Sequence, residues 1–100
     1  MEITTSKDNN YTVLNLNGRL DTNTSGSLED RLEELFDKNE NFIKLDFKEL
    51  EYLSSAGLRV LLGAQKKINS SEGDMIIKNA NSDIKEIFSI TGFLDILKVD

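Results

Sequence analysis

Residues 46–62 read DFKELEYLSSAGLRVLL and contain the change of pattern from which the fold class follows. A β-strand ends at the beginning of this stretch, and a loop of acidic and apolar residues comes after it. Ser54 and Ser55 then open a helix, with Leu58 and Leu61 on its buried stripe. A strand followed closely by a helix predicts an α/β domain.

The same stretch has a glycine in the first turn of the predicted helix. Gly57 is unusual there, because glycine in a helix costs about 1 kcal/mol relative to alanine. A residue without a side chain is favoured where another backbone or a protein comes close. Serine is also a common helix N-cap. Ser54 and Ser55 therefore have a purely structural interpretation, which the pattern alone favours.

Strands and helices also alternate before and after this stretch. Alternating apolar and polar residues and short apolar runs predict strands at 3–6, 11–17, 42–47 and 75–77. Apolar residues at helical spacing predict helices at about 24–38, 55–69 and 82–91. Asp8-Asn9-Asn10 reads as a hairpin turn. The apolar tail at 93–99 is either a last strand or a docked segment.

This order predicts one α/β domain over residues 1–100. Helices between strands imply parallel pairing, and the opening hairpin adds an antiparallel pair. We therefore expect a mixed sheet of four to five strands. Because the strands have one polar face, we expect the helices to pack on one face of the sheet.

The composition disfavours several classes of function. The 100 residues include no histidine and no cysteine, and they carry a net charge of −6. Without histidine there is no Ser-His-Asp triad, and without cysteine there is no thiol catalysis and no zinc–thiolate site. An enzyme based on carboxylates or lysine stays possible, but we expect no enzyme, no cofactor and no metal. Neither common phosphate-binding glycine motif occurs. The acidic charge disfavours a nucleic acid partner.

The same sequence predicts a cytoplasmic protein. No apolar run approaches the ~20 residues of a membrane helix, so no membrane insertion is expected. The first residues lack the charged and apolar regions of a signal peptide.

Asp46 allows a second interpretation, as a phosphate-accepting aspartate like that of response regulators. Such domains need an acidic pair after the first strand, whereas Gly18-Arg19-Leu20-Asp21 supplies a single carboxylate. Asp46 is therefore predicted to bond loop amides at the end of its strand.

Several segments together resemble one family. Residues 52–62 resemble the signature of the STAS family, the sulfate transporter and anti-sigma factor antagonist domains. Residues 18–21 resemble its other marker, residues 46–47 fit its third strand, and residues 91–93 fit the end of its third helix. These matches follow the family's order across nearly the whole chain, so the resemblance implies a STAS-like fold.

The resemblance also implies the function of an anti-sigma factor antagonist. In such antagonists the phosphorylated serine lies two residues before the glycine of the second helix, and that position is Ser55. An anti-sigma factor that is itself a serine kinase would add the phosphate, and a serine phosphatase would remove it. Only the unphosphorylated antagonist would bind the anti-sigma factor and so release the sigma factor.

Two positions depart from the family's usual pattern. Ser54 stands where many members carry aspartate, which makes it a rival phosphorylation site. Ala56 stands where a second serine is frequent.

The resemblance places the partner surface at the start of the second helix and the nearby marker loop. The predicted partner-binding residues are Asp21, Thr22, Ser54, Ser55, Gly57, Leu58 and Arg59. Leu58 also fits the buried stripe, so core packing and partner contact both remain open for it. A free protein of this kind is expected to be a monomer.

One alternative function remains. Some similar domains are small cytoplasmic subunits that dock on the ATPase of lipid-transporting ABC complexes. The serine pair favours the antagonist, although a serine fits position 55 in either kind of protein.

Overall fold

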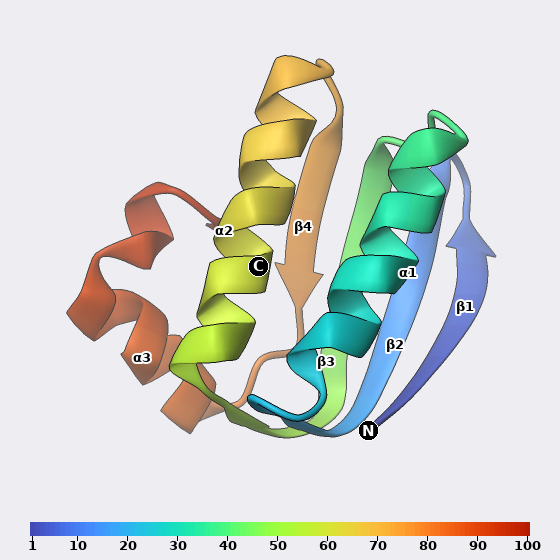
Figure 1. Cartoon of the computed structure of the whole chain (residues 1–100). Coiled ribbons are helices and arrows are strands. Elements are labelled where there is room, and N and C mark those ends of the chain that lie inside the picture. Colours follow the sequence, from blue (N-terminus) through green and yellow to red (C-terminus); the bar gives the residue numbers. More distant parts are fainter.

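The computed structural model describes all 100 residues as a five-stranded sheet with helices packed against it (Figure 1). In chain order the elements are β1 (Glu2–Asp8), β2 (Tyr11–Leu20), α1 (Ser25–Asp37), β3 (Phe42–Leu53), α2 (Ser55–Ser70), β4 (Asp74–Lys78), α3 (Ser82–Thr91), the 3-10 turn η1 (Phe93–Asp95) and β5 (Lys98–Val99). The sheet order is β1-β2-β3-β4-β5. β1 is antiparallel to β2, and the other neighbours are parallel. The predicted mixed sheet and its three helices are confirmed.

The core lies between the sheet and the helices. Leu14 and Leu16 of β2 and Ile43 and Leu45 of β3 are almost completely buried, which is the alternation that predicted these strands. α1 and α2 lie side by side over one face of the sheet, and α3 lies beside α2 (Figure 1). Burying apolar side chains in this layer is the main favourable contribution to folding.

β3 is longer than the sequence indicated. Residues 48–53, which the pattern predicted as a loop, continue the strand to Leu53. The register between β2 and β3 shifts twice, between Asn15 and Asn17 and between Gly18 and Arg19. Such bulges insert an extra residue into one strand. The buried positions of β3 therefore change from a spacing of two residues to a spacing of three, which hid the strand from a period-two analysis.

β2 also extends beyond its predicted end at residue 17. It passes through Gly18, whose φ of +116° suits glycine, and reaches Leu20. At the C-terminus both open alternatives occur in turn. η1 is followed by the buried Leu97, and β5 then pairs with β4.

Candidate functional site

The carboxyl ends of β2 and β3 lie together and position the site. Leu20 is the register partner of Leu53, and both strands end there. The backbone N–H of Ser54 donates to the carbonyl oxygen of Leu20 at 2.9 Å. This bond places the loop after β2 beside the first turn of α2. The structure thus brings the two predicted halves of the partner surface together.

The loop after β2 is held by its own polar groups. The Asp21 carboxylate accepts hydrogen bonds from the N–H groups of Asn23 at 3.0 Å and Thr24 at 3.2 Å. The Thr24 hydroxyl donates to the carbonyl oxygen of Arg19 at 2.7 Å. Thr22, at the outside of this turn, is exposed. Asp21 therefore shapes the loop, and Thr22 offers its side chain to solvent.

The two adjacent serines have different positions in the helix. Ser54 is the N-cap of α2, with extended backbone, and its hydroxyl oxygen accepts a bond from the Gly57 N–H at 3.3 Å. Ser55 is the first residue of the helix and is exposed, with no part in the cap. The cap interpretation is therefore correct for Ser54, and Ser55 presents its hydroxyl at the start of α2.

Gly57 and Leu58 face the interior of the domain. A Cβ atom on Gly57 would lie 2.8 Å from both Leu20 Cγ and Leu53 Cδ1, too close without rearrangement. The close approach that this glycine allows is therefore internal, between α2 and the ends of the two strands. Leu58 is only 8% exposed and belongs to the core cluster. Of the two roles that were open for Leu58, the structure shows core packing.

Two further residues of this surface were not among the predicted contacts. The Arg19 guanidinium carbon lies 4.2 Å from the centre of the Tyr52 ring, and these residues are register partners in β2 and β3. Tyr52 is 41% exposed although it is large and aromatic. Arg59, on α2, is also exposed. The sequence contained both members of the pair, but only the shifted strand register places them in contact.

Asp46 lies within β3 rather than at its end. Its carboxylate accepts bonds at 3.0 Å from the Lys48 N–H and from the Asn79 side-chain amide. The predicted bond to a loop amide holds for the side chain of Asn79, which follows β4, whereas Lys48 lies within β3. The predicted strand end is wrong because pairing with β2 continues to Leu53.

The arrangement contains no group of three His, Cys, Asp or Glu side chains suited to hold a metal ion. No helix has the length and apolar character needed to span a membrane. The predicted partner residues line neither of the two main cavities of the protein. The site is thus a surface at one end of the sheet.

Fold and site together define a small α/β domain that presents a serine at the exposed start of a helix. The chain belongs to the STAS domain family, whose model matches residues 2–100, and the predicted membership is confirmed.

The related proteins share one description, that of an anti-sigma factor antagonist. The chain is 33% identical over 99 residues to BtrV of Bordetella bronchiseptica, a protein assigned to the anti-sigma factor antagonists, and the match covers 99% of this chain and 85% of that protein. It is 28% identical over 88 residues to the anti-sigma F factor antagonist of Paenibacillus polymyxa, covering 87% and 75% of the two chains.

Solved structures confirm the fold. The crystal structure of TM1081 from Thermotoga maritima matches with a TM-score of 0.92 at 22% identity, covering 97% of this chain and 84% of that one. Unphosphorylated SpoIIAA, an anti-sigma factor antagonist, matches with a TM-score of 0.79 at 16% identity, covering 99% and 87%. The phosphorylated form of SpoIIAA from Bacillus matches with a TM-score of 0.77 at 17% identity, covering 99% and 91%.

Proposed function

We propose that this protein is an anti-sigma factor antagonist that is switched by phosphorylation of Ser55. The observation that carries the proposal is the division between the two serines. Ser54 caps α2, which leaves the exposed Ser55 hydroxyl accessible to a kinase. The recurrent name of the relatives supports the same function.

The proposed partner is an anti-sigma factor with serine kinase activity. It transfers the γ-phosphoryl group of ATP to the Ser55 hydroxyl oxygen, whose proton is released as ADP leaves. A serine phosphatase returns the hydroxyl by hydrolysis. The protein itself acts by binding and not by catalysis.

Phosphorylation at this position is compatible with the fold of the domain. A phosphoserine adds about −1.5 to −2 charges at neutral pH. The first turn of a helix has backbone N–H groups without partners in the helix, and the helix dipole favours an anion there. α2 has no acidic residue in its first turn that would repel the phosphate. The modified domain therefore keeps its structure.

The same charge opposes a partner that covers the start of α2. A dianion enclosed by a protein surface loses its water, and any carboxylate opposite repels it. A loss of about 3 kcal/mol weakens binding more than a hundredfold. A local charge thus acts as a binding switch and needs no change in conformation.

The proposed contact surface combines the exposed residues at this end of the sheet. Thr22, Ser55 and Arg59 offer polar groups, and the stacked pair of Arg19 and Tyr52 offers the residue types most enriched in binding hot spots. The four other predicted partner residues have internal contacts and support this surface from within. They are Asp21, Ser54, Gly57 and Leu58.

A matched pair of substitutions tests the proposal. Ser82 is the first residue of α3, is exposed, and follows the cap residue Asn81, as Ser55 follows Ser54 in α2. We expect Ser55→Asp to weaken binding to the cognate anti-sigma factor at least tenfold, and Ser82→Asp to leave it unchanged. Calorimetric titration measures both affinities. Equal affinities of the two variants would contradict the proposed switch.

Phosphate incorporation tests the site itself. With the cognate kinase and ATP, we expect Ser55→Ala to take up no phosphate, and Ser54→Ala and Ser82→Ala to be phosphorylated. Phosphorylation of Ser55→Ala at the wild-type rate would transfer the assignment to Ser54 or another residue. Recovery of an ABC transporter ATPase in place of a kinase, in a pull-down from the native cell, would support the transporter subunit instead.

A further inference from the structure

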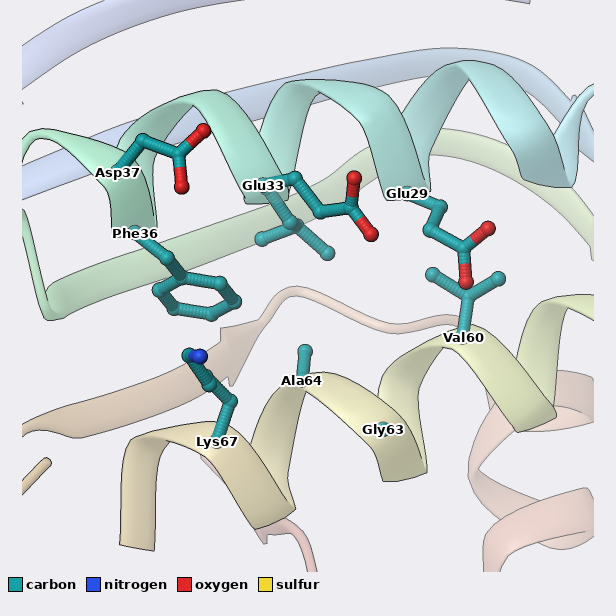
Figure 2. Close-up of a pocket in the computed structure, with 9 residues that line it drawn as sticks. Glu29, Glu33, Phe36, Asp37, Val60, Gly63, Ala64 and Lys67 are labelled. Atoms are coloured by element: carbon teal, nitrogen blue, oxygen red, sulfur yellow. The ribbon is translucent and has the colours of Figure 1, made fainter. Parts of the chain in front are cut away.

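A groove runs between α1 and α2 (Figure 2). It lies outside the proposed contact surface around Ser55, which is called the Ser55 surface below. It has a volume of about 400 Å³ and is open to solvent. Leu32 and Phe36 of α1 and Val60 and Ala64 of α2 form its apolar part. Phe36 and Val60 are only partly buried although both pack against the core. The groove therefore exposes apolar side chains between the two helices.

The α1 side of the groove carries a row of negative charge. Glu29, Glu33 and Asp37 follow one another at intervals of four residues, so they project from the same side of the helix, as Figure 2 shows. None of the three takes part in any of the six ion pairs of the domain. Like charges at this spacing destabilise a helix. Lys67 of α2 also lines the groove but forms no ion pair with these carboxylates, so negative charge remains in excess along the groove.

The opposite wall contains a glycine that the domain does not need for its own packing. Gly63 is exposed, lies in the interior of α2 and lines the groove. A Cβ atom placed on it would meet nothing within 4 Å. Glycine inside a helix is destabilising relative to alanine. A bare backbone here leaves room for a second molecule to approach α2 closely.

We propose that this groove binds an amphipathic basic helix of a partner protein. Apolar side chains of that helix would lie on Phe36, Val60 and the surface above Gly63, as in other helix-in-groove complexes. Its Lys or Arg residues, one per helical turn, would pair with the three carboxylates. The row runs from Glu29 to Asp37, a rise of about 12 Å along α1, so two to three turns of the partner are enough. The groove shares no residue with the Ser55 surface, and this inference does not rest on the proposed function.

The test uses a synthetic probe. It is a 16-residue peptide of leucine and lysine with leucine at helical spacing, compared with a scrambled peptide of the same composition. Titration into the ¹⁵N-labelled full chain should shift the amide signals of the groove residues on α1 and α2. The scrambled peptide should bind at least tenfold more weakly. Equal binding of both peptides, or shifts spread over the whole surface, would overturn the proposal.

Two variants separate the groove from general attraction to an acidic protein. The triple variant Glu29→Gln, Glu33→Gln, Asp37→Asn should weaken peptide binding at least tenfold. A matched control removes three exposed carboxylates elsewhere through Glu49→Gln, Glu51→Gln and Glu86→Gln. It should change binding less than threefold. Similar losses in the two triple variants would show that only net charge matters, and would refute a specific site.

A third variant tests the apolar part without changing charge. Gly63→Leu places a side chain in the groove at a position where a Cβ atom meets nothing within 4 Å, so the protein should fold. It should reduce peptide affinity at least tenfold. Unchanged affinity would refute the site. A dimer of the wild-type protein in sedimentation that Gly63→Leu abolishes would show that a second copy fills the groove, and would overturn the assignment of the partner.

Discussion

Ser54 and Ser55 are neighbours in the chain, yet the start of α2 gives their hydroxyls different roles. Ser54 has an extended backbone and bonds to the Gly57 N–H, while Ser55 already has its place in the helix and faces solvent. An N-cap hydroxyl compensates a backbone donor that the helix leaves unpaired. One serine thus stabilises the helix, and the other is available for chemistry.

This difference is measurable as stability. Ser54→Ala removes the cap and should lower the free energy of unfolding by about 0.5–2 kcal/mol. Ser55→Ala removes no internal contact and is its matched control, with an expected change within about 0.5 kcal/mol. Urea unfolding of both variants gives the comparison. A larger loss for Ser55→Ala than for Ser54→Ala would reverse the assignment of the cap.

Two glycines of the same helix should respond to alanine in opposite directions. Gly57→Ala places a methyl group 2.8 Å from side-chain carbons of Leu20 and Leu53, and such overpacking should cost about 1–3 kcal/mol. Gly63→Ala meets no atom within 4 Å and should stabilise by about 0.5–1 kcal/mol through its higher helix propensity. Thermal and urea unfolding measure both. A stable Gly57→Ala protein would show that the strand ends yield easily.

Among the elements, the starts of β2, β4 and β5 are tied by a polar contact across the sheet. The Tyr11 hydroxyl donates to the Asp74 carboxylate, which Lys98 also contacts at 3.3 Å. The Tyr11 ring meets the Phe42 ring edge-on, with centres 5.9 Å apart. Burial raises the pKa of the Asp74 carboxyl, but the hydrogen bonds from Tyr11 and Lys98 outweigh it and hold the pKa below its ordinary value.

The lowered pKa makes this contact dependent on pH. The pKa of an aspartate in an unfolded chain is about 3.9. Above that pH the contact contributes fully to stability, and this contribution is lost as pH falls through the lower pKa of folded Asp74. Tyr11→Phe keeps the ring and removes the donor. We expect it to be less stable than the wild type at pH 7, with a difference that narrows below about pH 4.

Urea midpoints between pH 2 and pH 7 measure this effect, and Tyr52→Phe is the control. Tyr52 is exposed and stacks with Arg19 through its ring. The urea midpoint of Tyr52→Phe should differ little from that of the wild type, and this difference should not change over the same pH range. A Tyr11→Phe difference that is constant with pH would show that Asp74 titrates independently of the hydroxyl.

At the scale of the whole molecule, the candidate phosphorylation site and the core are arranged so that one changes without the other. Leu20 and Leu53, at the ends of β2 and β3, pack against Gly57 in the first turn of α2. The Ser55 side chain lies outside this packing. A charge added at Ser55 therefore alters the surface and leaves the supporting layer intact.

The expected result is a phosphorylated protein with the same fold. Stoichiometric phosphorylation of Ser55 should change the unfolding free energy by less than about 1 kcal/mol, because an anion at a helix N-terminus is favourable. Amide NMR signals should shift in the first turn of α2 and in the loop at residues 21–24, and stay in place elsewhere. Widespread shifts across β1, β4 and α3 would instead indicate a conformational switch.

Local patterns in the sequence are sufficient to predict the helices of this protein. Residues 55–70 and 82–91 form helices within one residue of the predicted ends, because their caps and apolar spacing are set by neighbours in the chain. The candidate site was not placed in this way, because the pattern of the serine pair and Gly57 alone favoured a structural helix cap. The resemblance to the STAS family supplied the choice of Ser55.

The tertiary structure alone determined the rest. Pairing of β2 with β3 through two register shifts extends β3 to Leu53 and brings Arg19 onto Tyr52. The tertiary structure also shows that position 57 needs glycine because the ends of β2 and β3 pack against it, and that Leu58 belongs to the core. These features depend on residues more than 30 positions apart in the chain, as in the pairing of Leu20 with Leu53. No local period encodes such contacts, because they arise only when separate strands and helices pack together.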